Sequence, residues 1–187
     1  MRKLILRMTV TLDGVVAPEN GKDVFDFSDE EVWNYTFGML ETVDTMLLGA
    51  GMHQEYLSHW QAALTSPTAS QSERKYAAMA ARMPHFVLSR TLREVEWTNA
   101  TVLTGGVDGI VDLKKQAGGD IILWGGPTAA AAAIEAGVVD EYHLVTHPVI
   151  AGGGKKLFGN ILETHRVRHQ DSKTFPSGIV ALEYARA

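Results

Sequence analysis

Residues 121–141 read IILWGGPTAAAAAIEAGVVDE, and this stretch indicates the fold more directly than any other. An apolar strand over 121–125 runs through Gly125 and Gly126 into an alanine-rich helix, which begins at Pro127 and stops at Gly137. A strand that passes directly into a helix is the building unit of an α/β sheet. Ligands of such sheets bind beyond the carboxyl ends of the strands, where each strand meets its helix.

The glycine pair has two explanations, and the pattern leaves both open. In the first, a ligand touches the backbone at Gly125 and Gly126, because the free N–H groups of a helix N-terminus suit a phosphate. In the second, the glycines only form a tight turn that packs the alanine helix closely on the sheet.

Strand-like and helix-like segments alternate along the rest of the chain. The expected strands lie at residues 4–10, 45–49, 85–89, 101–104, 121–125, 141–150 and 178–185. The expected helices lie at 29–43, 52–64, 70–83, 108–117 and 127–137. Ser28 is the expected N-cap of the first helix. This order predicts a single α/β domain over 1–187, with helices on both faces of a mostly parallel sheet and antiparallel strands at its C-terminal edge.

The composition narrows the classes of partner. The chain has 187 residues, 45% hydrophobic and 21% charged, with a net charge of −5 and no basic block, which argues against a nucleic-acid partner. It has no cysteine, so disulfides, thiolate catalysis and zinc–thiolate sites are excluded, and a cytoplasmic location is expected. The N-terminal apolar run is broken by Arg7 and Thr9, which indicates a strand instead of a signal peptide. No run approaches the roughly 18 apolar residues that span a bilayer, so no membrane partner is expected.

Two further strand ends, the first of them a strand-to-helix junction, carry candidate phosphate contacts. Gly49 and Gly51 follow the strand at 45–49, but Gln54 occupies the third glycine position of a dinucleotide fingerprint. The helix N-terminus there remains a candidate for a second phosphate. Ser89 and Arg90 follow the strand at 85–89, where a hydroxyl and a guanidinium can grip a phosphate, although an ordinary surface arginine is the alternative.

The histidine pairs do not predict a metal site. His143 and His147 are four residues apart on an expected strand, which separates them by about 13 Å. His165 and His169 would be neighbours only on a helix, and no carboxylate completes a ligand set. The GGGK segment at 152–155 lacks the pattern of a phosphate-binding P-loop and is expected to connect strands.

Taken together, four segments carry a resemblance to a known family: MTVTLDGVVA, LLGAGMHQEYLSHW, HFVLSRTL and ILWGGPTAAAAAIEAGVVDEYHLVTHPVIAGGGKKLF. The chain resembles the dihydrofolate reductase-like superfamily over nearly its whole length, and in particular the C-terminal reductase domain of bacterial riboflavin biosynthesis proteins. The resemblance implies a three-layer α/β/α sandwich that binds NADPH across the strand ends.

The resemblance also implies roles for individual residues. The nicotinamide would lie near Thr9, Val16 and Ala17. The residues implied around the pyrophosphate are Gly126, Pro127, Thr128 and Ala129, with Gly49, Gly51, Met52 and Gly125 at the neighbouring turns. Leu88, Ser89 and Arg90 would meet the adenosine end, with Arg90 on the 2′-phosphate. A cis peptide between Gly125 and Gly126 is a further expectation from the family.

The chain departs from the family at two phosphate contacts. Relatives often have an arginine and a threonine after the glycine that ends the second strand, where this chain has Ala50 and Met52. The first-helix carboxylate that binds folate in dihydrofolate reductases has no secure counterpart either. Asn34 falls near its place, with Glu30 and Glu31 one turn before. We therefore expect weakened cofactor binding and poor reduction of folates.

These observations predict a cytoplasmic NADPH-dependent reductase of a pterin-like or ribosylated aminopyrimidine substrate. Glu30, Glu31, Asn34 and Trp124 are the candidate catalytic residues, and Thr9, Val16 and Phe37 are expected to complete the substrate wall. Trp124 is either a stacking wall between cofactor and substrate or a plain core tryptophan. The alternative function is a non-catalytic nucleotide-binding or regulatory protein. A homodimer is expected, with the strand at 141–150 as the edge that needs covering.

Overall fold

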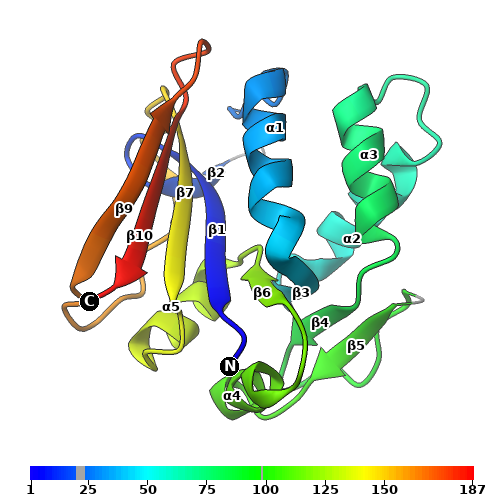
Figure 1. Cartoon of the computed structure of the whole chain (residues 1–187), viewed down its shortest axis with the longest axis vertical. Helices are drawn as coiled ribbons and strands as arrows, with labels where there is room; N and C mark the ends of the chain where they lie inside the picture. Colours follow the sequence, from blue (N-terminus) through cyan, green and yellow to red (C-terminus); the bar gives the residue numbers. More distant parts are fainter. Residues whose placement is uncertain (20–23, 98) are drawn as a thin grey trace.

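The computed structural model describes residues 1–19, 24–97 and 99–187, and its centre is an eight-stranded sheet (Figure 1). The strand order is β5-β4-β3-β6-β1-β7-β10-β9. These strands are β1 (Leu4–Thr11), β3 (Val43–Gly49), β4 (His85–Leu88), β5 (Ala100–Leu103), β6 (Asp120–Leu123), β7 (Glu141–His147), β9 (Val167–Thr174) and β10 (Val180–Arg186). The pairings from β5 to β7 are all parallel, while β10 pairs antiparallel with both β7 and β9. The predicted mixed sheet with an antiparallel C-terminal edge is confirmed.

The expected edge strand is not at an edge. β7 lies between β1 and β10, and pairs with β1 over seven residues and with β10 over six. The outer position belongs to β9, whose eight residues are all exposed and carry a charged, polar sequence. Because β9 lacks the apolar alternation of a half-buried strand, periodicity could not locate it, and the edge was assigned wrongly to residues 141–150.

Two short strands form a separate ribbon beside the carboxyl end of β1. β2 (Val15–Pro18) pairs antiparallel with β8 (Gly154–Lys156), which lies in the glycine-rich loop after β7. The Asp13 carboxylate ties the two loops together, because it accepts hydrogen bonds from the backbone N–H groups of Ala151 and Gly152 at 3.0 and 2.9 Å. The expected connecting loop at 152–155 therefore contributes a strand of its own.

Five α-helices match the five predicted helical segments, each with shorter bounds. They are α1 (Glu30–Met39), α2 (His53–Ala63), α3 (Gln71–Ala80), α4 (Val107–Lys115) and α5 (Pro127–Glu135), and a short 3-10 helix, η2 (Leu40–Thr42), follows α1. The N-cap of α1 is Asp29, whose carboxylate accepts from the Glu31 N–H at 2.9 Å, and not Ser28 as expected. A carboxylate there also interacts favourably with the positive end of the helix dipole. The structure has no helix long and apolar enough to cross a membrane, in the part of the chain that it describes.

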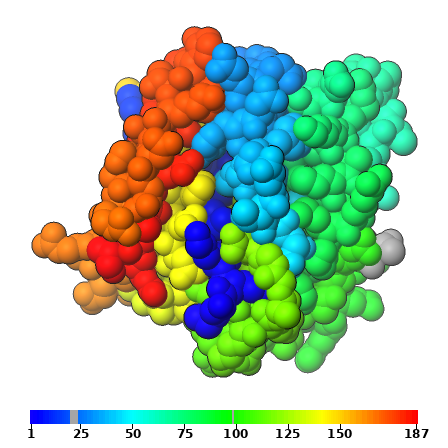
Figure 2. Space-filling model, in the orientation of Figure 1, coloured from blue at the N-terminus to red at the C-terminus, as the bar shows by residue number. Residues whose placement is uncertain are grey.

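Alternate residues of the central strands face two different helix layers. On β1, Leu4, Leu6, Met8 and Val10 pack with α4 and α5, whereas Ile5 packs with Trp33 of α1 and Tyr76 of α3. In the space-filling view, α1 (blue) covers the middle of the second face, between β9 (orange) and α3 (green) (Figure 2). The domain is thus a three-layer α/β/α sandwich, as the family resemblance implies.

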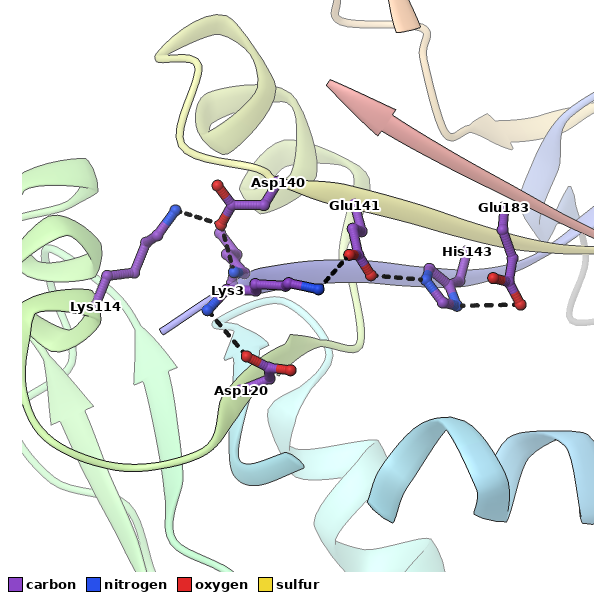
Figure 3. Close-up of polar contacts among 8 residues, drawn as sticks. Lys3, Lys114, Asp120, Asp140, Glu141, His143 and Glu183 are labelled. Carbon is purple, nitrogen blue, oxygen red and sulfur yellow. Dashed lines mark hydrogen bonds and ion pairs between the residues drawn. The ribbon is translucent and has the colours of Figure 1, made fainter. Parts of the chain in front are cut away.

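Ion pairs cross the amino end of the sheet. Lys114 Nζ lies 2.5 Å from Asp140 Oδ2, and Lys3 Nζ lies 2.7 Å from Glu141 Oε1 (Figure 3). The contacts continue from Glu141 through His143 to Glu183, whose carboxylate accepts a 2.7 Å hydrogen bond from the Tyr35 hydroxyl of α1. This network joins α4, β7 and β10 and fastens α1 onto the sheet.

Candidate functional site

Backbone hydrogen bonds draw the carboxyl ends of β3, β4 and β6 together. The Gly49 N–H donates to the Gly125 carbonyl at 2.8 Å, and the Ala50 N–H donates to the Leu88 carbonyl at 3.3 Å. The three strand ends that the sequence singled out therefore share one edge of the sheet. This edge is where α/β folds bind their ligands.

The structure shows that Gly125 and Gly126 have different surroundings, which bears on the two explanations of the pair, a ligand at the backbone or a tight turn. Gly125 and Gly126 both have positive φ, 117° and 57°. A Cβ atom on Gly125 would lie 2.6 Å from Sδ of the buried Met8 side chain, which would have to shift, so Gly125 packs closely against Met8. A Cβ atom on Gly126 would meet nothing nearer than Gly49 Cα at 4.0 Å. Packing thus contributes to the choice of glycine at Gly125, whereas a side chain at the partly exposed Gly126 would meet no overlap.

The expected cis peptide between Gly125 and Gly126 is not present, because their bond is trans. The positive φ angles of the two glycines turn the chain from β6 into α5 without it.

The helices that follow this edge begin without a side-chain cap. The N-caps of α5 and α2 are Gly126 and Met52, and neither makes a side-chain hydrogen bond to its helix. By contrast, α1 is capped by Asp29, and α3 has a full capping box at Ser70. An uncapped helix N-terminus retains free N–H groups and a partial positive charge, and both favour an anion.

Arg7 is a buried cation on the α1 side of the same edge, with 6% of its surface exposed. Its Nη1 donates to Thr9 Oγ1 at 2.6 Å, and its Nη2 lies 3.5 Å from Thr36 Oγ1 of α1. The guanidinium carbon lies 5.3 Å from the centroid of the Trp124 ring. Burial lowers the pKa of Arg7 to about 10, so it is still charged at neutral pH. Sequence reasoning used Arg7 only to exclude a signal peptide, although a charge inside an apolar strand was itself the signal.

Trp124 connects the core to this polar face. Its ring is partly buried and packs edge-on to Tyr76 with the centroids 5.6 Å apart. Its Nε1 is buried without a hydrogen-bond partner. The residue therefore packs as a core tryptophan, and the Arg7 guanidinium lies over its ring. The predicted role as a stacking wall between cofactor and substrate stays a prediction.

His147 ends β7 as a second buried group that sequence reasoning considered only as a metal ligand. It is 3% exposed, its Nε2 has no hydrogen-bond partner, and its ring packs edge-on to both Phe25 and Phe27, with centroids at 5.1 and 5.8 Å. Burial, followed by the nearby charge of Arg7, lowers the pKa of His147. No group of three or more histidine, aspartate and glutamate residues is arranged to hold a metal ion within residues 1–19, 24–97 and 99–187.

The comparisons with known proteins identify the family. The model of the RibD C-terminal domain family matches residues 2–181. The chain belongs to the RibD C-terminal domain family.

Individual relatives agree with this family in sequence and in fold. The uncharacterized protein YyaP of Bacillus subtilis is 29% identical over 183 residues, covering 98% of this chain and 94% of YyaP. The crystal structure of a putative riboflavin biosynthesis protein from Shewanella sp. PV-4 superposes with a TM-score of 0.73, at 20% identity and 99% coverage of both chains. A dihydrofolate reductase from Enterococcus faecalis, complexed with NADP(H), superposes with a TM-score of 0.63, at 14% identity, covering 98% of this chain and 96% of that one. The fold is that of dihydrofolate reductase-like proteins.

The residues that the RibD resemblance assigns to the adenosine end differ in what they contact. Ser89 is buried, and its Oγ accepts from the N–H groups of Thr91 and Leu92 at 3.2 and 3.0 Å, so the hydroxyl closes the turn after β4. Arg90 is exposed and forms no hydrogen bond or ion pair with any described residue. Leu88 is partly buried against the core. Only the Arg90 side chain is free to reach a ligand without breaking a contact.

The residues assigned to the nicotinamide end lie on two neighbouring elements. Thr9 is near the end of β1 and accepts the Arg7 hydrogen bond. Val16 and Ala17 lie in β2, where Val16 packs on the core and Ala17 is exposed opposite Lys155.

Of the residues assigned to the pyrophosphate and its neighbouring turns, Gly51 and Thr128 are exposed beside the starts of α2 and α5.

The candidate catalytic residues of α1 point away from Arg7. The Glu30 carboxylate accepts a 2.6 Å hydrogen bond from Ser72 of α3, and Glu31 lies 3.9 Å from Lys173 of β9. Asn34 is exposed. The side chain that α1 presents to Arg7 is Thr36, whose hydroxyl donates to the Val32 carbonyl at 2.9 Å. The structure thus brings Thr9, Thr36 and Trp124 around Arg7, and leaves Glu30, Glu31 and Asn34 outside that group.

Proposed function

We propose that this member of the RibD C-terminal domain family is an NADPH-dependent reductase. The observation that carries the proposal is the uncapped N-terminus of α5, which begins behind the open backbone of Gly126. Backbone hydrogen bonds join this point to the ends of β3 and β4. An elongated ligand with a pyrophosphate in its middle fits such an edge, because helix N-termini stabilise phosphate charge.

The residues present fit NADPH in their chemistry. The free backbone of Gly126, Thr128 and Ala129 would hold the pyrophosphate, with Pro127 shaping the first turn. The unpaired guanidinium of Arg90 would hold the 2′-phosphate, which is an anion that arginine binds well. Thr9, Val16 and Ala17 would border the nicotinamide. NADPH, when bound, supplies the hydride, and the protein supplies binding, orientation and a dry environment.

For the acceptor, we propose a pterin-like or ribosylated aminopyrimidine molecule, beside Thr9 and the ring of Trp124. A planar heterocycle stacks favourably on an aromatic ring. Folates are poor candidates, because their reductases bind them with a buried carboxylate on the first helix. In this chain, the side chain that α1 presents to Arg7 is Thr36. The proton of the reduction would come from water, or from Glu30 or Glu31 after a movement of α1.

Thermal unfolding tests the cofactor assignment directly. NADPH at about 100 times its dissociation constant should raise the free energy of unfolding by about 2.7 kcal/mol. NADH should stabilise the protein less, because it lacks the 2′-phosphate, and Arg90→Ala should remove most of this difference. Equal curves for NADPH and NADH in the unaltered protein would make Arg90 an ordinary surface residue.

One observation favours a second candidate, a non-catalytic nucleotide-binding or regulatory protein. Ala50 and Met52 stand where the family resemblance implies an arginine and a threonine as phosphate contacts, and neither side chain can donate a hydrogen bond to a phosphate. Assays of NADPH absorbance with dihydrofolate and with a ribosylated aminopyrimidine separate the candidates. Turnover of the aminopyrimidine supports the reductase, whereas NADPH binding without turnover of either compound supports the second candidate.

We also propose a homodimer, with β9 as the exposed sheet edge in place of the strand at 141–150 that the sequence suggested. β9 is the outer strand of the sheet, and its eight residues are exposed, with the unpaired edge that a second strand can cover. Light scattering at micromolar concentration should give about twice the 20.4 kDa mass of one chain. A mass near that of one chain would refute the dimer.

A further inference from the structure

Arg7 differs from the other buried cations in having no anionic partner. Arg2 pairs with Asp44, and Lys114 pairs with Asp140. Arg7 is equally buried, yet no carboxylate lies within ion-pair distance of it among the residues that the structure describes. A buried charge is normally paired, because removing an ion from water is costly unless another charge compensates it.

The groups that surround Arg7 do not neutralise it. Its hydrogen-bond partners are the hydroxyls of Thr9 and Thr36. It faces the ring of Trp124, which follows β6, and lies in register with His143 of β7. The Arg7 charge also acts on the Tyr35 and Tyr76 hydroxyls and on the His147 imidazole. The Glu183 carboxylate, in register with His143 on β10, is held by the Tyr35 hydroxyl and forms no ion pair with Arg7. Burial raises the pKa of both tyrosines and, with the Arg7 charge, lowers that of His147, so all three are neutral at pH 7.

The guanidinium points toward the carboxyl end of β1. Its Nη1 reaches Thr9, which lies two residues further along the strand and on the same face. The opposite edge of the group is unsatisfied, because Nε has no hydrogen-bond partner and Nη2 is as far as 3.5 Å from the Thr36 hydroxyl. A small turn away from Thr36 would present Nε and Nη2 together, the pair of donors that binds two oxygens of one carboxylate or phosphate.

We propose that Arg7 binds an oxyanionic group, a carboxylate or a phosphate, of the molecule that accepts the hydride. This inference rests on the proposed reductase function and narrows its substrate class. The ligand supplies the negative charge that the protein lacks at this point. If the residue at this position only filled space beneath α1, it would need no charge. An apolar side chain of similar volume fills such a position without the desolvation free energy that a buried charge costs.

Matched aromatic probes test the charge requirement without the natural substrate. Benzoate, phenylphosphonate and benzamide have the same ring, and only the first two are anions. Isothermal titration calorimetry with the cofactor-free and the NADP⁺-saturated protein should show at least one anion binding about 10- to 100-fold more tightly than benzamide. The stronger of the two anions identifies the group as a carboxylate or a phosphate.

Three variants assign this preference to Arg7. Arg7→Met should bind all three probes equally weakly, and Arg7→Lys should keep part of the preference, because it keeps the charge and loses the two-pronged geometry. Lys115→Met, which removes an exposed cation on α4, should behave as the unaltered protein. Circular dichroism confirms that each variant is folded, and Arg7→Lys serves if Arg7→Met is not.

The inference is overturned if benzamide binds as tightly as both anions, if no probe binds, or if Arg7→Met retains the preference. NADPH titration of the same samples separates this result from the cofactor assignment. An anion preference without NADPH binding fails the reductase proposal alone. NADPH binding without an anion preference fails the Arg7 proposal alone.

Discussion

Two buried arginines five residues apart show how differently the two ends of the sheet are built. Arg2 precedes β1 and donates to the Gly119 carbonyl at 2.6 Å, to Thr45 and to the Asp44 carboxylate. Arg7, further along the chain, has two threonine hydroxyls and an aromatic ring around it, and no carboxylate in the described chain. The residue type is shared and both arginines are buried, so the difference lies in the groups that the neighbouring elements place at each end.

The same contrast extends across the sheet. At the amino end, Lys3, Lys114, Asp120 and Asp140 all have polar partners (Figure 3). Toward the carboxyl end, Arg7 Nε, Trp124 Nε1 and His147 Nε2 are buried without hydrogen-bond partners. His85 Nε2, at the start of β4, and His143 Nδ1, in the middle of β7, also lack a hydrogen-bond partner, although His143 Nδ1 lies 3.9 Å from the Glu183 carboxylate. The separation is therefore a tendency of the fold and not a strict division. Paired groups serve stability, and unpaired buried groups are the sites where a ligand has most to contribute.

The largest effect should come from Gly125, where the carboxyl end is closed by packing. Gly125→Ala should lower the free energy of unfolding by about 2–4 kcal/mol, because positive φ strain adds to the shift that the buried Met8 side chain would have to make. Gly126→Ala should cost about 1–2 kcal/mol from strain alone, yet remove the stabilisation by NADPH. Urea unfolding with and without NADPH measures both. Equal stability losses would erase the distinction between a packing glycine and an open one.

The next effect concerns the paired arginine. Arg2→Met should lower the free energy of unfolding by about 2–3 kcal/mol, since Gly119, Thr45 and Asp44 lose their buried donor. Asp44 is half exposed and regains water, which keeps the loss below that of a fully buried pair. Lys115→Met should change stability by less than about 0.5 kcal/mol in the same urea experiment. An Arg2→Met protein as stable as the parent would mean that pairing at the amino end contributes little.

Arg7→Met should have the opposite sign. Without ligand, it should raise the free energy of unfolding by about 1 kcal/mol, because a buried unpaired charge is replaced by an apolar side chain of similar length. Chemical denaturation of Arg2→Met and Arg7→Met under identical conditions gives the comparison directly. A loss for Arg7→Met as large as that for Arg2→Met would show that both arginines are structural.

The smallest effect is a pH dependence at His147. Its pKa in the folded state is lowered by burial and by Arg7, so the unfolded chain takes up the proton first as the pH falls. Stability should therefore be full above the ordinary histidine pKa of about 6.5 and should decrease as the pH drops below it. His147→Gln should flatten the part of this slope that His147 causes. His85→Gln is the matched control, since burial also lowers the pKa of His85, far from Arg7. An unchanged slope in His147→Gln would exclude His147 as its cause.

The sequence predicted the elements well wherever burial imposes a period. The six parallel strands and β10 overlap the expected runs to within about three residues, and all five α-helices overlap expected segments. Prediction missed β9, which has no buried face, and the short ribbon of β2 and β8, which depends on contacts between distant loops. It also placed the cap of α1 at Ser28 where Asp29 serves, because neighbouring capping residues compete and local geometry decides between them.

What the sequence determined alone was local: an α/β order, glycines at a strand-to-helix turn, and an alanine helix that begins at proline. These follow from backbone freedom and side-chain periodicity, which act over a few residues. Only the tertiary structure decided that Gly125 is closed by Met8 while Gly126 is open, and that Arg2 is paired while Arg7 is not. Packing and charge compensation depend on residues brought together from different strands and helices, and the spacing of these residues along the chain does not predict which of them come into contact.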